Sequence, residues 1–222
     1  MERPKDIKSF HSLRALHKRG LNAIRIVVIF HLTGLIGLYF LPTKPYFILL
    51  VPFHLILMTF ILFINHDELN LKFFYFFFTI VLAGWLIEYI GVHTSLLFGA
   101  YYYGHTLGPS IKQVPVIMGF NWFILIYATG VSMRKLPINS MVARVFCGSL
   151  LLVILDVLIE PVANRLDYWH WLNKDMLIQN YCCWFIVSVI LLFVFELFRF
   201  KKQSMVAPSL LVCQFIFFAA LQ

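Results

Sequence analysis

Apolar residues gather along the chain in seven runs, and the segments between them hold most of the charged side chains. A helix that crosses a bilayer needs about 20 consecutive apolar residues, and runs near that length indicate membrane spans. The fifth and seventh runs are short, so the pattern predicts seven spans and leaves six open. The runs are Ile24 to Leu41, Tyr46 to Ile64, Phe73 to Ile90, Val114 to Met133, Val145 to Ile159, Tyr181 to Phe198 and Val206 to Leu221.

The composition supports this interpretation, because 61% of the 222 residues are hydrophobic and only 13% are charged. Such a chain is not typical of a soluble domain. We therefore expect an all-α fold: a multi-pass bundle of about seven transmembrane helices, in the plasma (inner) membrane. Residues 24–222 form a single transmembrane domain. Residues 1–23 form a basic leader, either a solvated anchor or an interfacial helix, and no cleavage pattern follows it.

The positive charges predict the orientation of the bundle. The net charge is +8, and in the seven-helix arrangement fourteen basic residues fall on one side and four on the other. The positive-inside rule then places the N-terminus in the cytoplasm and the C-terminus outside. Membrane lipids account for the charge, and nucleic acid is not an expected partner. The smaller set is Lys44, Lys112, Arg165 and Lys174.

Two longer connections, Gly91 to Gln113 and Glu160 to Asn180, are too aromatic for ordinary solvated loops. Both fall on the predicted outer side of the membrane. Irregular backbone at membrane depth has to be covered by protein, so we expect these segments to cap the bundle.

Carboxyl groups lie close to these segments. Asp156 and Glu160 are four residues apart and therefore share a helix face, and Glu88 lies near the end of the third run. A buried charge in a span costs about 2.5 to 3.5 kcal/mol, so such residues usually face a cavity or a partner. Two neighbouring acids disfavour double ionisation, which makes one a candidate general acid and the other a base. The alternative is a structural pair that fixes the loops.

Other chemistries lack their residues. The eight histidines form no di-iron box, the last run has no lysine for a retinal Schiff base, and the four cysteines have no CxxC spacing. DVLIEPVANRLD has spaced acids like those that hold magnesium diphosphate in membrane prenyltransferases, but Glu160 and Asn164 weaken that match. We expect no metal and no cofactor.

Three stretches together resemble a known family. FGAYYYGHTLGPSIKQVPVIMGFNW (98–122), DVLIEPVANRLDYWHW (156–171) and QNYCCWFIVS (179–188) are similar to the membrane carotenoid hydratases, which include bisanhydrobacterioruberin hydratase and carotene 1',2'-hydratase. The resemblance spans about Glu88 to Ser188. The matching positions are Glu88, Gly91, Gly99, Tyr101, Tyr103, Leu107, Gly108, Val114, Pro115, Trp122, Asp156, Glu160, Pro161, Trp169, Trp171, Asn180 and Trp184.

The resemblance implies cofactor-free addition of water to the terminal C1=C2 bond of a carotenoid ψ end group, as in lycopene or γ-carotene, with a substrate that enters from lipid. Asp156 or Glu160 would protonate the alkene, and Glu160 or Glu88 would position water. His93 is a further acid–base candidate. The expected substrate-binding residues are Tyr101, Tyr103, Trp122, Trp169, Trp171, Trp184 and Asn180. The Phe-rich run at residues 73–78 either lines the substrate path or packs in the core.

Two alternatives stay open. A carotenoid cyclase or isomerase would use the same cation without water, and a pigment-binding or transport protein would use the acids only to hold the cap. The natural carotenoid and the oligomeric state are not predicted.

Overall fold

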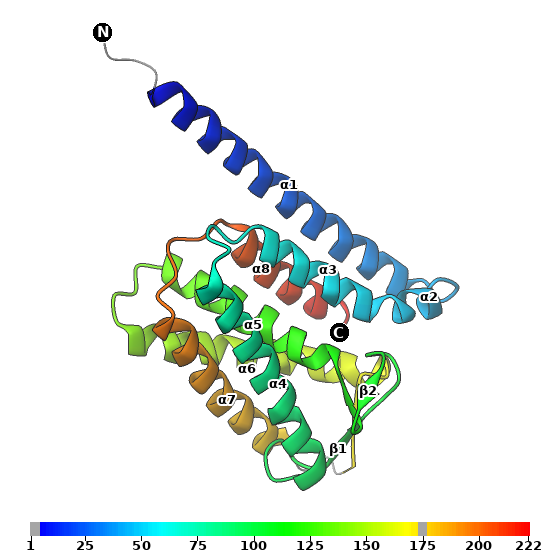
Figure 1. Cartoon of the computed structure of the whole chain (residues 1–222). Helices are drawn as coiled ribbons and strands as arrows, with labels where there is room; N and C mark the ends of the chain where they lie inside the picture. Colours follow the sequence, from blue (N-terminus) through cyan, green and yellow to red (C-terminus); the bar gives the residue numbers. More distant parts are fainter. Residues whose placement is uncertain (1–4, 173–176) are drawn as a thin grey trace.

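Each of the seven predicted runs contains a helix in the computed structural model, which describes residues 5–172 and 177–222. The second run forms two helices, so the described residues contain eight (Figure 1). Four short strands accompany them, which the all-α expectation missed. The elements are α1 Lys5–Tyr39, α2 Lys44–Leu49, α3 Val51–Ile64, α4 Leu71–Thr94, β1 Tyr101–Tyr103, β2 Ser110–Ile111, β3 Val114–Pro115, α5 Ile117–Lys135, α6 Met141–Arg165, β4 Trp169–Trp171, α7 Leu177–Leu197 and α8 Val206–Ala220.

The break in the second run lies at Leu50, between α2 and α3. Each of these helices has a proline in its first two positions, Pro45 in α2 and Pro52 in α3. Proline lacks an N–H group, and the first turn of a helix does not need one. The two prolines therefore allow the chain to end one helix and begin the next around a single residue.

Four helical segments are long and apolar enough to cross a membrane, which indicates an integral membrane protein. Val51–Ile64 and Val206–Ala220 are apolar but shorter. The count of seven spans stays a prediction, as does the orientation of the two ends. The four segments are Arg19–Tyr39, Leu71–Thr94, Met141–Arg165 and Ile178–Leu197.

Helix α6 is longer than the fifth apolar run from which it was predicted. We expected a short span from Val145 to Ile159, but α6 has 25 residues and continues past Pro161. A proline inside a helix removes one backbone donor, yet the turn after it remains helical here. Leu166 N donates to Val162 O at 2.9 Å, and Tyr168 N donates to Ala163 O at 2.8 Å. These bonds end α6 one turn beyond the proline and aim the chain toward β4.

Helix α5 occupies the centre of the bundle and is buried along most of its length (Figure 1). Two glycines bring it close to α4. A Cβ atom on Gly84 would lie 2.5 Å from Trp122 Cβ, and one on Gly119 would lie 2.4 Å from Val81 O. Small residues let membrane helices approach closely. This crossing places Trp122 directly against α4.

Basic residues gather at one end of the bundle, where α5 ends and α6 begins. Glu196 of α7 forms ion pairs there with Arg134 at 3.1 Å and Arg144 at 2.9 Å. Lys201 contacts Glu68 at the same end. Two of the basic residues used to predict the orientation, Arg3 and Lys174, lie outside the described residues.

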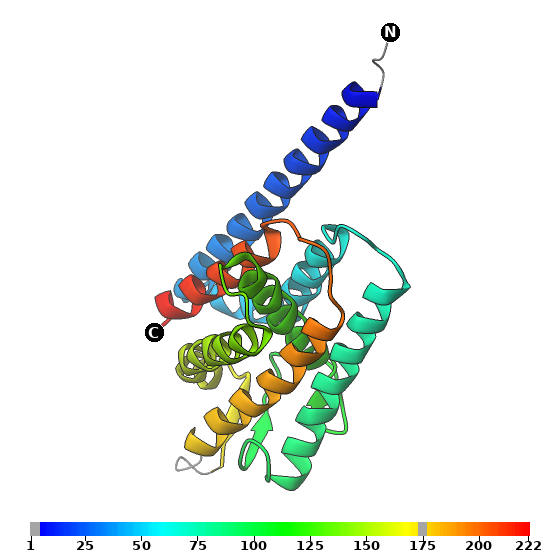
Figure 2. The ribbon, with the colours of Figure 1, turned by 90° about the vertical axis from the view of Figure 1, so that its left-hand side faces the viewer.

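The basic leader is helical from Lys5 and continuous with the first apolar run, forming the 35 residues of α1. Its N-terminal part extends beyond the bundle (Figure 2). Arg19 donates a hydrogen bond to Ile64 O, which fixes α1 beside the end of α3. A position of the leader at the membrane surface stays a prediction.

Candidate functional site

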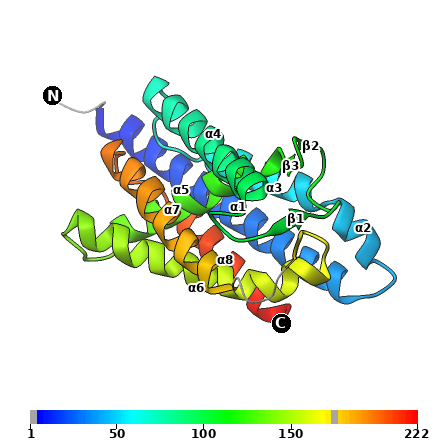
Figure 3. The ribbon, with the colours of Figure 1, turned by 90° about the horizontal axis from the view of Figure 1, so that it is seen from below.

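The two aromatic connections meet in the structure. Strand β1 pairs antiparallel with β4, so that Tyr101 faces Trp171 and Tyr103 faces Trp169. We call residues 101–103 and 169–171 the aromatic cap. With β2 and β3, strand β1 lies at one end of the bundle (Figure 3). Because side chains alternate along a strand, Tyr101 and Tyr103 turn inward while Tyr102 is exposed.

Asp167 fixes the corner between α6 and the aromatic cap. Its carboxylate accepts hydrogen bonds from His105 N at 2.8 Å and His170 Nε2 at 2.7 Å. These two donors hold the pKa of Asp167 below its usual value. A Cβ atom on Gly104 would lie 2.2 Å from Asp167 O, so the corner requires glycine at that position.

Glu88 of α4 lies beneath the aromatic cap and is buried. Its Oε2 accepts hydrogen bonds from the hydroxyls of Tyr101 and Tyr103, both at 2.7 Å. Its Oε1 accepts from Trp122 Nε1 at 2.8 Å. Burial raises the pKa of both tyrosines, which therefore remain donors at neutral pH. Three donors from two separate elements thus hold this carboxyl group in one position.

Asp156 and Glu160 lie on α6, one turn apart, and share a partner on α7. Asn180 Nδ2 donates to Asp156 Oδ2 at 2.8 Å and to Glu160 Oε1 at 3.1 Å. Trp171 Nε1 donates to Glu160 Oε2 at 2.7 Å. Asp156 is fully buried, and its Oδ1 has no hydrogen-bond partner among the described residues. One carboxyl oxygen is therefore left for another proton donor or acceptor.

A small cavity of about 20 Å³ lies between Glu88 and Glu160. A volume of roughly 10 to 15 Å³, measured in the same way, is enough to hold one water molecule. Its polar walls offer hydrogen bonds to such a molecule. The lining residues are Glu88, Phe98, Tyr101, Tyr103, Met118, Glu160, Trp169, Trp171, Asn180 and Trp184.

A larger cavity of about 380 Å³ adjoins the small one. Met118, Trp169 and Trp184 line both. Its other walls are mainly apolar side chains of α1, α3, α5 and α8. Long apolar ligands bind in cavities of this character. The carboxyl groups therefore lie beside a space suited to an apolar chain.

Most of the predicted site residues come together here. The structure joins Asp156, Glu160 and Asn180 by hydrogen bonds, and Trp184 packs on Trp122 with ring centroids 4.7 Å apart. His93 lies elsewhere: it is exposed, and its Nδ1 is 2.9 Å from Tyr89 O of its own helix.

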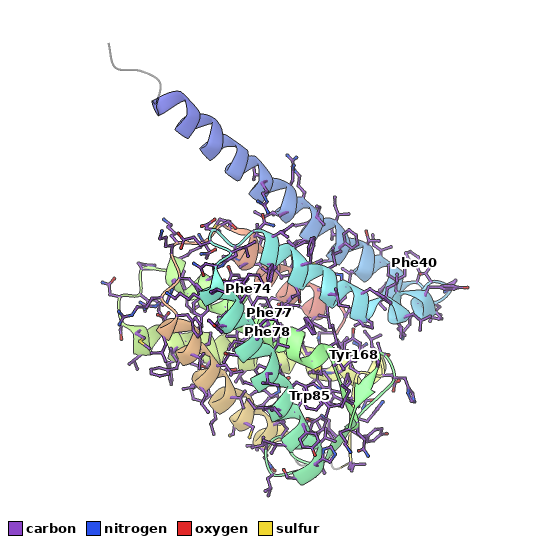
Figure 4. The ribbon with its side chains drawn as sticks, viewed as in Figure 1. Phe40, Phe74, Phe77, Phe78, Trp85 and Tyr168 are labelled. Atoms are coloured by element: carbon purple, nitrogen blue, oxygen red, sulfur yellow. The ribbon has the colours of Figure 1, made fainter. Side chains whose placement is uncertain are left out.

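The Phe-rich run of α4 lines neither of these two cavities. Phe73 and Phe76 are fully buried, whereas Phe74 and Phe78 are exposed along α4 (Figure 4). Packing in the core and contact with lipid account for the run. A role in lining the substrate path is not supported.

Several residues of this region gave no clear signal in the sequence. Phe98 and Met118 line the small cavity as ordinary apolar residues. His31, His54, Asn121 and Gln214 line the larger one. The available signal was that these polar residues lie within apolar runs. The sequence did not show which sides of the four helices face one another, so it did not place the residues around one cavity. Within residues 5–172 and 177–222, no group of three His, Cys, Asp or Glu side chains lies close enough to hold a metal ion.

The fold and site together define a membrane-embedded helix bundle with buried carboxyl groups beside an apolar cavity. Comparison with protein families shows which family the chain belongs to. The model of the carotenoid biosynthesis protein family matches residues 45–222, and the chain belongs to that family. No curated protein and no solved structure matches it. The matched region contains every residue that lines the small cavity.

Proposed function

We propose that this protein is a cofactor-free carotenoid hydratase, a lyase that adds water to the terminal C1=C2 bond of a ψ end group of the lycopene or γ-carotene type. The observation that carries the proposal is a cavity that fits one water molecule and is lined by two buried carboxyl groups, Glu88 and Glu160, with a third, Asp156, joined to Glu160 through Asn180. Membership of the family supports a role in carotenoid biosynthesis.

Asp156 is the proposed acid. An unactivated trisubstituted alkene reacts with water only after protonation, which requires a positioned proton donor. Asp156 Oδ2 accepts a hydrogen bond from Asn180, whereas Oδ1 has no hydrogen-bond partner among the described residues and is the oxygen proposed to carry the proton. Glu160 is one turn away, and two adjacent carboxylates in an apolar setting favour retention of one proton between them.

Glu160 and Glu88 are the proposed residues for the water. Both line the small cavity, from opposite helices. The oxygens of Glu88 already accept three hydrogen bonds, so it is better suited to orient the water than to take its proton. Glu160 is therefore the favoured base. This cavity favours hydration over cyclisation or isomerisation, which need no water.

The aromatic rings are proposed to stabilise the cation. Transfer of a proton from Asp156 to C2 places positive charge on C1, a tertiary carbon. A π face near a cation contributes about 0.5 to 2 kcal/mol. Trp169 and Trp184 line both cavities, at the boundary that an end group crosses to reach the carboxyl groups.

The proton balance closes within the site. Asp156 gives one proton to C2, the water oxygen bonds to C1, and the water proton goes to Glu160. The site is reset when a proton passes from Glu160 back to Asp156, and Asn180 Nδ2, which donates to both carboxyl groups at 2.8 and 3.1 Å, holds them as neighbours on α6. The product is a tertiary 1-hydroxy carotenoid, and no other reactant is consumed.

The test is expression of the full chain in a host that accumulates lycopene, followed by separation and mass analysis of the pigments. Hydration gives a more polar carotenoid that is heavier by one water. A cyclase or isomerase gives a product of unchanged mass. A pigment-binding or transport protein gives no new compound, and either of these outcomes contradicts the proposal.

A further inference from the structure

The larger cavity, whose lining is mainly apolar, includes four residues with amide or imidazole side chains. His31 of α1, His54 of α3, Asn121 of α5 and Gln214 of α8 all line it. None of them belongs to the carboxyl site. A hydrocarbon chain has no use for hydrogen-bonding groups, and burying them without partners costs free energy. A ligand group of matching chemistry would give them hydrogen-bond partners.

Gln214 is the clearest of these residues. It is 8% exposed, and its Oε1 has no hydrogen-bond partner among the described residues. A buried acceptor without a partner is destabilising. A donor from a bound molecule would satisfy it.

His31 supplies a second acceptor. Its Nδ1 lies 2.8 Å from Val27 O, and because a carbonyl only accepts, Nδ1 carries the hydrogen. In a neutral imidazole this leaves Nε2 as an acceptor. The ring packs edge-on against His54, with centroids 4.7 Å apart, and against Phe217 at 5.9 Å. Packing on both neighbours fixes the ring in the cavity wall.

Two acceptors call for a donor, and the side-chain amides of Gln214 and Asn121 also bring N–H donors to the cavity lining. A hydroxyl group is both, whereas a carbonyl only accepts. We infer that the larger cavity contains a subsite for the hydroxyl group of an oxygenated carotenoid end. At least one of the ligands that bind in this cavity therefore carries a hydroxyl group.

Two sources supply such a hydroxyl. It is either the tertiary hydroxyl that the reaction makes, bound as the product leaves, or a ring hydroxyl already present at a substrate end. The first source rests on the proposed function, and the second does not. The subsite itself is tested by binding, without turnover.

The experiment measures Kd for the full chain in detergent with two matched pairs of carotenoids: lycopene against 1,1'-dihydroxylycopene, and β-carotene against zeaxanthin. The hydroxylated member of at least one pair should bind about tenfold more tightly, because one satisfied hydrogen bond of about 1.4 kcal/mol corresponds to that ratio. Preference in the first pair identifies the product hydroxyl, and preference in the second a ring hydroxyl.

Gln214→Met and His31→Phe should each bring the preferred ratio close to one. Gln222→Leu is the matched control, since Gln222 is exposed outside the cavity and bonds Leu158 O and Phe218 O. Size-exclusion elution checks that each variant is folded. Equal Kd values within both pairs, or a ratio that survives both variants, would overturn the inference. Selective binding without any hydration would instead overturn only the proposed function.

Discussion

Asp156 and Glu160 accept hydrogen bonds from the same nitrogen atom, Asn180 Nδ2, at 2.8 and 3.1 Å. The two carboxyl groups are therefore held as a pair by a residue of another helix, and neither turns away from the other without losing a buried bond. Asn180 acts as a positioning residue for both.

Asp156→Asn and Glu160→Gln are expected to lower hydration of lycopene by at least about 100-fold, because each removes a proton donor or acceptor that contributes roughly 10²- to 10⁴-fold. Pigment analysis of membranes with equal protein levels measures the loss. Glu68→Gln, an exposed acid near the basic end, is the control and should keep full activity. Wild-type activity in both site variants would rule out the assigned acid and base.

Glu88→Leu should destabilise the fold, although leucine is apolar and similar in size. The change leaves the donors of Tyr101, Tyr103 and Trp122 buried without an acceptor, at about 1 to 3 kcal/mol each. Thermal unfolding in detergent should show a clear fall in Tm. Tyr103→Phe removes one donor only, so its Tm should fall much less; an equal fall in the two variants would contradict this account.

Gly104→Ala should displace the aromatic cap, since the added Cβ would lie 2.2 Å from Asp167 O. Faster proteolysis near residue 104 and reduced product are the expected results. Gly20→Ala is the matched control, because nothing lies within 4 Å of a Cβ atom there. If both variants behave alike, the close contact at the corner is not what holds the aromatic cap.

Acid should destabilise the end of the bundle that contains His66. Burial lowers the pKa of His66 from 6.5 to about 4, and its Nδ1 lies 2.7 Å from Tyr127 Oη. The unfolded chain then binds a proton before the folded one does, so stability falls as the pH drops from 6.5 toward 4. Tm measured across this window should fall, and His66→Gln should reduce the slope. An unchanged slope in the variant would show that His66 is not responsible.

The predicted topology is tested with a reporter fused after Gln222. The seven-span arrangement with a cytoplasmic N-terminus places this end outside, so an enzyme reporter active only outside the cytoplasm should score positive. A fusion after Arg134 should score as cytoplasmic in the same experiment. A cytoplasmic result at Gln222 would remove one span from the arrangement.

The helices were predictable because each apolar run is long enough to carry its own signal. The shared face of Asp156 and Glu160 followed from their spacing within one helix. The length of α6 did not, because a proline usually marks a helix end, whereas here the turn beyond Pro161 keeps its hydrogen bonds. The break at Leu50 depended on two prolines that a hydrophobicity scan does not distinguish.

The contacts of the site lay beyond the sequence. Strands β1 and β4 have three residues each, too few for a periodic pattern, and their pairing depends on how α5 and α6 cross. The aromatic residues were identifiable as a group, yet which of them donate to Glu88 and which to Glu160 is set by that pairing. Asn180 looked like a substrate-binding residue, and only the packing of α6 on α7 gives it two carboxyl partners.

The corner at Asp167 has a consequence for how the protein is made. His105 and Asp167 are 62 positions apart, and all of α5 and α6 lies between them. The hydrogen bond between His105 and Asp167 therefore forms only after those helices have been inserted and packed, because a contact between distant residues has to overcome the entropy of loop closure. The complete site should thus form last in biogenesis, and a nascent chain released before α7 would be inserted in the membrane without Asn180, the shared partner of Asp156 and Glu160.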